Sequence, residues 1–97
     1  MKYIVTNAHQ YNGTIHQDAY LCNDREEAED VFNSFVEDTF LLMLQKYNKG
    51  LRRAGILTSV MDDIDTFKAD NIHQGCVFDY ETDDRTEQYH TEIFETE

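Results

Sequence analysis

The longest amphipathic stretch of the chain covers residues 23–50, and any fold must bury its apolar side. Its apolar residues recur at three- and four-residue steps, the spacing of one helix face: Ala28, Val31, Phe32, Phe35, Thr39, Leu42 and Met43. The second half widens this stripe with Phe40, Leu41, Leu44 and Tyr47. Asn23 or Asp24 can cap the first turn, with Glu26 or Glu27 completing a capping box. Gly50 can end the helix in the left-handed conformation. The pattern predicts one long helix that packs its apolar side against another layer.

The first 22 residues have the composition of a β-hairpin. Residues 2–8 are rich in β-branched and aromatic side chains, which favour a half-buried strand. The pair Asn12-Gly13 favours a two-residue hairpin turn, because both residues tolerate a positive φ. A second strand is predicted over residues 14–22. Its expected inner face holds Ile15, Ala19 and Leu21, and the residues expected outside are His16 and Asp18.

After residue 50 the pattern gives a shorter helix and two more strands. The helical residues are Val60, Met61, Ile64 and Phe67, with Thr58 or Ser59 as the cap. A loop is expected over residues 71–75, a strand over 76–81, a connecting turn over 83–88 and a final strand over 89–93. The order ββααββ predicts an α+β fold: an antiparallel sheet of about four strands, with one long and one short helix on one face. Residues 1–97 form a single small acidic domain, because a chain of this length holds one core.

The charge of the chain is strongly one-sided. Twenty carboxylates and eight basic side chains give a formal net charge of −12, which repels itself and weakens the compact state. A hydrophobic fraction of 40% is nevertheless ordinary for a folded protein. Half of the basic residues fall within positions 46–53, at and just after the predicted helix end, where they suit the helix dipole. Direct binding to nucleic acid is not expected, because no stripe of lysine and arginine is present.

No catalytic, cofactor or metal-binding residues are predicted, and the chain is expected not to be an enzyme. Sequence motifs of serine hydrolases, phosphate loops, zinc proteases and CxxC sites are absent. Asp79, Glu81 and Asp83 have the spacing of a calcium loop, but Asp84 stands where glycine is needed and His90 where glutamate is needed. The histidines and cysteines have no partners at zinc-ligand spacing.

The lack of a long apolar run and the spacing of the cysteines indicate the compartment in which the protein is expected to act. No run of apolar residues has the length of a signal peptide or a membrane span, so a cytoplasmic protein without membrane contact is expected. Cys22 and Cys76 lie 54 positions apart and are expected to be free thiols.

Acidic residues gather in two parts of the chain, and both are candidate partner-binding surfaces. The first group lies in the long helix and comprises Asp24, Glu26, Glu27, Asp30, Glu37 and Asp38. The second lies in and after the predicted strand over residues 76–81 and comprises Asp79, Glu81, Asp83, Asp84 and Glu87. Capping gives Asp24 and a following glutamate a structural reason, and protection of a sheet edge could explain part of the second group. Asp30, Glu37 and Asp38 lie beyond the first turn, where like charges at i,i+4 are destabilising. They are the stronger indication of a partner.

Helical carboxylates could imitate the backbone of DNA. Residues four apart advance about 6 Å along a helix, and one strand of duplex DNA places a phosphate about every 3.4 Å. Carboxylates can therefore follow a phosphate track at about every second step. A protein using this surface would associate fast, and salt would weaken its binding.

The acidic segments DREEAED (residues 24–30) and FDYETDD (residues 78–84), with the small size and the charge of −12, give the chain a family resemblance. It resembles the small phage anti-CRISPR proteins of the DNA-mimicking kind, directed at a type I-F surveillance complex. The resemblance implies a non-enzymatic inhibitor that acts in the cytoplasm of an infected bacterial host. Its partner would be a basic DNA-binding protein or CRISPR surveillance complex, for which it would compete with DNA. The basic residues 46–53 depart from an all-acidic mimic and leave room for a second contact.

Two other classes of function stay open at this point. One is an acidic immunity or antitoxin-type protein that neutralises a basic nuclease by covering an exosite. The other is a small metal-dependent or hydrolytic enzyme. The sequence leaves open which acidic surface makes the main contact, which subunit of a partner it meets, and the oligomeric state.

Overall fold

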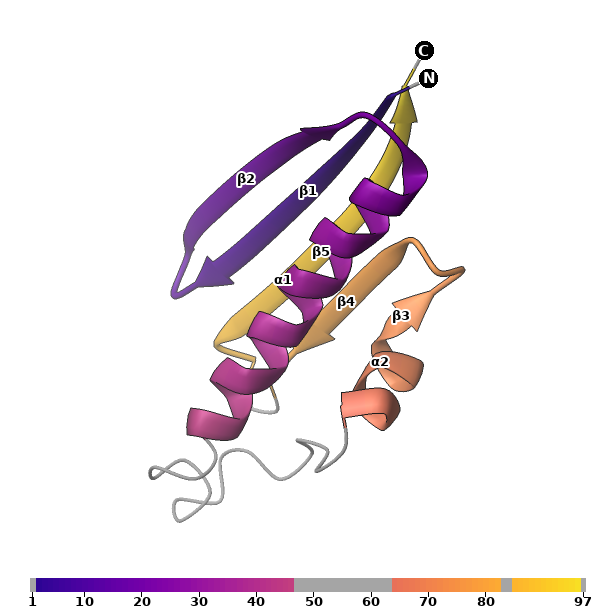
Figure 1. Ribbon diagram of the computed structural model, residues 1–97. Helices are drawn as coiled ribbons and strands as arrows, with labels where there is room; N and C mark the ends of the chain where they lie inside the picture. Colours follow the sequence, from indigo (N-terminus) through magenta and orange to yellow (C-terminus); the bar gives the residue numbers. More distant parts are fainter. Residues whose placement is uncertain (1, 47–63, 83–84, 97) are drawn as a thin grey trace.

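The computed structural model describes residues 2–46, 64–82 and 85–96, and these residues form an α+β fold with one antiparallel sheet and two helices (Figure 1). Along the chain the elements are β1 (Lys2–Tyr11), β2 (Thr14–Cys22), α1 (Arg25–Lys46), α2 (Ile64–Asn71), β3 (Ile72–His73), β4 (Val77–Glu81) and β5 (Glu87–Thr96). The predicted α+β class is confirmed. The described residues form five strands in the order ββααβββ, where about four strands in the order ββααββ were predicted.

The sheet is built from two hairpins that meet in its centre. Its strand order is β2-β1-β5-β4-β3, and every pair is antiparallel. Asn12 and Gly13 turn the first hairpin with φ values of 49° and 82°, which confirms the predicted turn. The central pair joins β1 to β5 in register from Lys2 opposite Thr96 to Tyr11 opposite Glu87.

Helix α1 begins at a capped N-terminus. The backbone N–H of Glu27 donates to Oδ1 of Asp24 at 2.8 Å, and Oε2 of Glu27 accepts from the backbone N–H of Asn23 at 3.1 Å. These bonds satisfy N–H groups that a helix start leaves without partners, as the sequence predicts. The predicted helix end at Gly50 and the predicted cap of the second helix lie outside the described residues.

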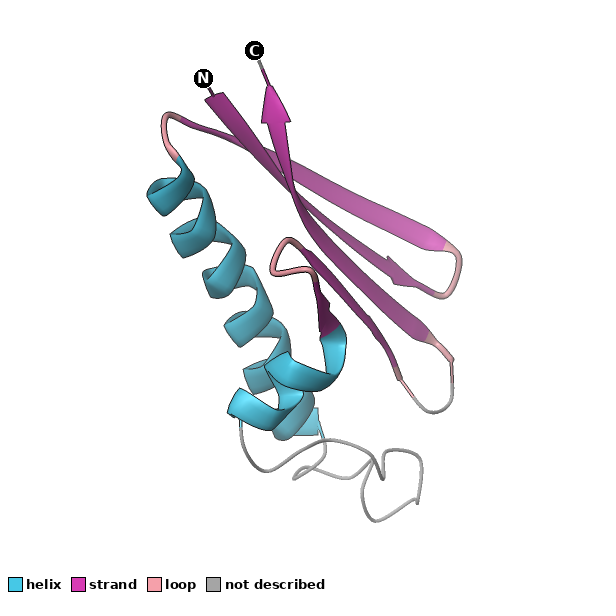
Figure 2. Ribbon diagram, turned by 90° about the vertical axis from the view of Figure 1, so that its right-hand side faces the viewer, coloured by secondary structure: helices cyan, strands magenta, loops and turns pink. Residues whose placement is uncertain are grey.

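Both helices cover the same face of the sheet (Figure 2). Phe67 of α2 sits at the centre of the core, with ring centroids 5.1 Å from Phe40, 5.7 Å from Phe78 and 5.1 Å from Tyr80. The other fully or nearly buried apolar residues are Val5, Cys22, Ala28, Phe32, Val36, Met43, Tyr89 and Ile93. The predicted stripe of α1 is narrower than expected, because Leu41 and Leu42 are exposed. Neither helix in the described part of the chain is long and apolar enough to cross a membrane.

Strands β1 and β5 continue past their predicted ends, to Tyr11 and Thr96, and two further differences from the prediction are larger. Ile72 and His73, expected in a loop, form the short strand β3, which pairs only with Val77 and Phe78. Strand β5 starts at Glu87, inside the predicted connecting turn, because its pairing with β1 continues to the end of that strand. Both differences come from pairing between segments, which local composition does not encode.

The predicted inner face of β2 is wrong. Counting back from the turn, Tyr20 pairs with Val5, whose side chain is buried under the helices. Because side chains alternate along a strand, the even-numbered residues His16 and Asp18 lie on the helix side. The sequence predicted that Ile15, Ala19 and Leu21 face the inside, but these residues lie on the helix-free face.

Candidate functional site

Two acidic residues, one just before α1 and one in its first turn, serve the start of the helix. Asp24 and Glu27 make the capping bonds described above and also lie close to the positive end of the helix dipole. Their carboxylates are exposed, but each has a structural role. Replacing either would change helix stability as well as any partner contact.

Glu37 also has an internal partner. Its Oε2 accepts a hydrogen bond from Nζ of Lys68 at 2.8 Å, which ties α1 to α2. The prediction that Glu37 lacks a structural reason is therefore wrong. The nearby acid Glu29 is paired in the same way, with Nε of Arg25 at 3.0 Å.

Three predicted site residues of α1 remain without such partners. Glu26, Asp30 and Asp38 are exposed, and none forms an ion pair or side-chain hydrogen bond with another described residue. Glu26 and Asp30 lie one turn apart on the side of the helix opposite the sheet. Asp38 lies two turns further along, so the three span about 18 Å of helix axis. Leu41 follows Asp38 by three residues and is 59% exposed, which adds an apolar contact to this surface.

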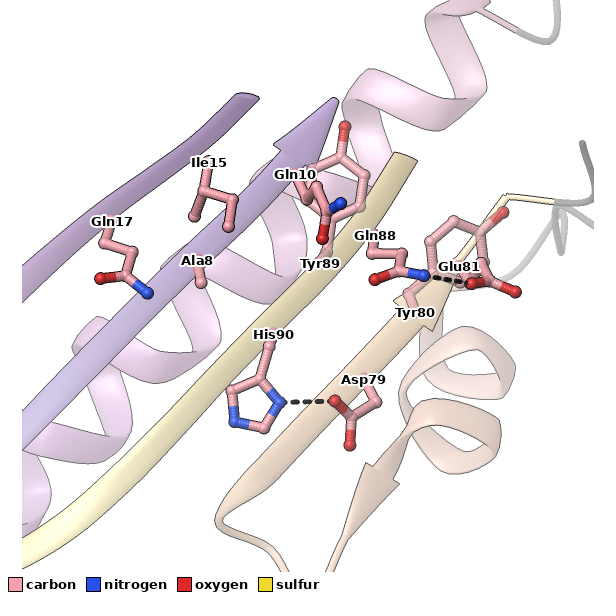
Figure 3. A pocket seen from close by; sticks show the side chains of 10 residues that line it. All are labelled: Ala8, Gln10, Ile15, Gln17, Asp79, Tyr80, Glu81, Gln88, Tyr89 and His90. Atoms are coloured by element: carbon pink, nitrogen blue, oxygen red, sulfur yellow. Dashed lines mark hydrogen bonds and ion pairs between the residues drawn. The ribbon is translucent and has the colours of Figure 1, made fainter. Parts of the chain in front are cut away.

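Two members of the second acidic group, Asp79 and Glu81, lie on the helix-free face of the sheet (Figure 3). Asp79 Oδ1 is 2.5 Å from Nδ1 of His90, and Glu92 Oε1 is 2.9 Å from Nε2 of the same ring. Partial burial disfavours the charged ring, but the two carboxylates outweigh it and raise the pKa of His90. Because a carboxylate oxygen lies beside each ring nitrogen, the protonated ring can donate through both, and in that form it has no lone pair for a general base.

This face also holds an open hollow of about 590 Å³ between the two hairpins. Its lining comprises Ala8, Gln10, Ile15, Gln17, Asp79, Tyr80, Glu81, Gln88, Tyr89 and His90. Nε2 of Gln88 donates to Oε2 of Glu81 at 2.5 Å, and Nε of Arg85 lies 3.8 Å from Oε1 of Glu81. The carboxylates at this hollow are thus engaged by neighbouring donors.

Glu87, predicted as a surface contact, faces the helix layer and is only 4% exposed. Its carboxylate accepts hydrogen bonds from the Tyr89 hydroxyl at 2.7 Å, from His9 Nε2 at 3.1 Å and from Lys46 Nζ. Burial opposes its ionisation, but these three donors outweigh burial and lower the pKa of Glu87. Burial and the bond to Glu87 raise the pKa of Tyr89. Through these buried bonds Glu87 connects β5 to β1 and to the end of α1.

The predicted site residues do not form one surface. Glu26 and Asp30 are exposed on α1, which covers one face of the sheet, whereas Asp79 and Glu81 lie on the other face. The predicted residues Asp83 and Asp84 lie outside the described residues. One flat or grooved partner surface can contact either group but not both.

Sequence reasoning missed His90 as the shared partner of Asp79 and Glu92, and Leu41 as an exposed neighbour of the helix acids. The sequence did contain a signal for the His90 contact with Glu92, because residues two apart on a strand share a face. Within the described residues, no group of three or more histidine, cysteine, aspartate or glutamate side chains could hold a metal ion. Cys22 and Cys76 are free, and burial, with nearby Glu27 and Asp24, raises the pKa of the Cys22 thiol.

Comparison of the chain with protein-family models, with curated proteins and with solved structures gives no match.

Proposed function

We propose that this protein is a non-enzymatic inhibitor that mimics double-stranded DNA and blocks DNA binding by a basic protein complex. The observation that carries the proposal is the set of exposed carboxylates on α1, Glu26, Asp30 and Asp38, which have no cation among the described residues. Like charges on one helix lower its stability unless a partner supplies the opposite charge. A basic nucleic-acid channel supplies it.

The α1 surface is a better candidate for the main contact than the helix-free face. Asp79 and Glu81 already interact with His90, Gln88 and Arg85, so a partner would have to displace those groups. Glu26 and Asp30 need no such exchange. A rigid helix also holds its side chains at fixed spacing, which lowers the entropic cost of binding.

The proposed partner is a CRISPR surveillance complex of type I-F, bound in the cytoplasm of a phage-infected bacterium. The protein would occupy the basic surface that receives the target duplex and would compete with DNA. No chemistry is required of either side. Attraction between opposite charges would speed association, and added salt would slow it.

A second candidate is an immunity-type protein that covers an exosite of a basic nuclease. The observation that favours it is the apolar pair Leu41 and Leu42, both exposed beside Asp38. Binding hot spots combine a desolvated apolar centre with a polar rim, so this end of α1 suits a protein surface outside a DNA channel.

A competition experiment separates the two candidates. A labelled target duplex is bound to the purified surveillance complex, and the protein is titrated in at several salt concentrations. The proposal expects displacement of the duplex, weakening as salt rises. A ternary complex that keeps the duplex bound would overturn the mimic and support an exosite contact. Absence of any binding would exclude this complex as the partner.

Paired charge reversals test the surface. We expect Glu26→Lys with Asp30→Lys to weaken inhibition at least about tenfold, because two attractive contacts become repulsive. The matched control is Asp70→Lys with Glu95→Lys, which makes the same change in net charge at exposed positions elsewhere. Equal losses in both variants would mean that net charge alone, and not the α1 surface, governs binding.

A further inference from the structure

Strand β2 is the most exposed regular element of the sheet. Eight of its nine residues are exposed, and only Cys22 at its end is buried. It pairs with β1 on one side and with no described strand on the other. Figure 2 shows the tip of this hairpin lying away from both helices.

The free edge of β2 presents backbone groups ready for pairing. In a two-residue hairpin the residues that flank the turn, Tyr11 and Thr14, exchange hydrogen bonds, and every second pair repeats this pattern. The N–H and C=O groups of the odd-numbered residues therefore point outward: Ile15, Gln17, Ala19 and Leu21. Natural sheet edges are often protected by proline, lysine, a bulge or an inward-pointing charge, and of these β2 has only Asp18 on its helix side.

Apolar exposure and charge both single out this hairpin. Of the seven large apolar side chains exposed in the described part of the chain, four belong to it: Tyr11, Ile15, Tyr20 and Leu21. Residues 2–22 contain one lysine and one aspartate, so their formal charge is zero and the charge of −12 lies outside them. The hairpin is thus the part of the chain at which two copies would repel each other least.

We infer that two copies of this chain pair through the free edges of β2, antiparallel about a two-fold axis, to form one ten-stranded sheet. Residues whose backbone groups point outward must lie opposite each other. The allowed registers are therefore shifted from one another by steps of two residues. With Gln17 opposite Gln17 of the second copy, His16 lies opposite Asp18 of that copy, twice by symmetry. Ile15 then lies opposite Ala19 of the second copy.

The neighbouring registers lack this complementarity. Centring the pair on Asp18 places the two aspartates opposite each other, which destabilises a strand pair. Centring it on His16 places the two histidines opposite each other and leaves Asp18 facing Thr14. A self-complementary edge is what a two-fold interface requires, and this favours a second copy over an unrelated strand.

The dimer leaves the proposed inhibitory surface accessible. A continuous sheet keeps both copies of α1 on one face, with Glu26 and Asp30 directed away from the sheet. The pairing does not depend on the proposed function. Because nine residues from each copy make a small interface, association should be weak and concentration-dependent.

Sedimentation equilibrium over a range of protein concentrations tests the dimer, at an ionic strength that screens the net charge. The apparent mass of the wild-type protein is expected to rise with concentration from the chain mass of 11.4 kDa toward twice that value. Ala19→Pro removes one outward N–H without touching the β1 ladder and should stay at the chain mass. A wild type that remains monomeric throughout overturns the inference, as does dimerisation that a folded A19P variant retains.

A charge exchange tests the register and does not rely on proline being tolerated. Both residues are exposed, so the monomer should fold in every variant. His16→Asp places like charges opposite each other and should weaken dimerisation at least about fivefold, and the exchanged pair H16D/D18H should restore it. No loss in H16D, or no recovery in the double variant, overturns the proposed register.

Discussion

At the scale of single residues, the buried Glu87 is the most consequential side chain of the described structure. It accepts hydrogen bonds from Tyr89, His9 and Lys46, which come from three different elements. The His9 ring also stacks on Tyr89, with centroids 4.2 Å apart and planes at 11°. A carboxylate with three donors is stable in the interior, whereas the donors would be costly to leave unpaired.

Glu87→Gln should lower the free energy of unfolding by about 1–3 kcal/mol, because the donors lose a charged acceptor. The matched control is Glu95→Gln, which makes the same chemical change at an exposed position of the same strand. Urea denaturation followed by circular dichroism measures both. A loss in E95Q equal to that in E87Q would show that the buried contacts contribute nothing specific.

The loss of stability in E87Q should also depend on pH. Folding lowers the pKa of Glu87 from its ordinary value of 4.5, so the stabilisation is present above that pH. It is lost as pH falls through the lowered pKa of the folded protein. The difference in unfolding free energy between wild type and E87Q should therefore shrink below pH 4.5. A difference that stays constant down to pH 3 would contradict the assigned ionisation.

The contribution of His90 to stability should change at a higher pH than that of Glu87. Its pKa is raised above 6.5 in the folded protein, so its pairing with Asp79 and Glu92 stabilises the fold below pH 6.5. This contribution disappears as pH rises through the raised pKa. An NMR titration should give a midpoint above 6.5, and Asp79→Asn should move it down. Asp70→Asn, distant from the ring, should leave the midpoint unchanged.

At the scale of elements, the capping residues of α1 can be separated from its candidate contact residues. Asp24→Ala should cost about 1 kcal/mol of stability, because the Glu27 N–H loses its acceptor. Glu26→Ala, at an exposed position that makes no such bond, should change stability by less than about 0.5 kcal/mol. Thermal unfolding compares them. Equal losses would mean that the whole acidic first turn acts on helix stability through its charge.

The sequence predicted most elements correctly but not every face. The α1 start and the Asn12-Gly13 turn follow from local patterns. The inner face of β2 was predicted wrongly because alternation defines two faces without saying which one the helices cover. The register could have corrected this, since counting from the turn places Tyr20 opposite Val5.

At the scale of the whole molecule, the predicted acidic surface separates into parts with different roles. Asp24 and Glu27 cap a helix, Glu37 binds Lys68, and Glu87 is buried. Composition reveals how many carboxylates a chain carries, but their partners come from elements that meet only in the fold. The residues that stay unpaired, such as Glu26, could not be selected from sequence alone.

The overall charge should make stability depend on salt. A net charge of −12 on a small domain repels itself, and the screening length falls from about 10 Å at 0.1 M salt to about 3 Å at 1 M. The melting temperature should therefore rise with added NaCl. The variant with Asp70→Lys and Glu95→Lys carries less excess charge and should gain less. A melting temperature that falls with salt would show that attractive ion pairs dominate the charge balance.

The central position of the β1–β5 pair has a consequence for how the chain folds. These strands join Lys2 to Thr96, so the pair with the longest ladder closes the largest loop that the described chain offers. Closing long loops is slow, and contacts of this kind lower folding rates. The first hairpin and α1 can form early, but their apolar sides stay uncovered until the last strand arrives. Pulsed hydrogen exchange during refolding should protect the β1–β2 amides before those that bond β1 to β5.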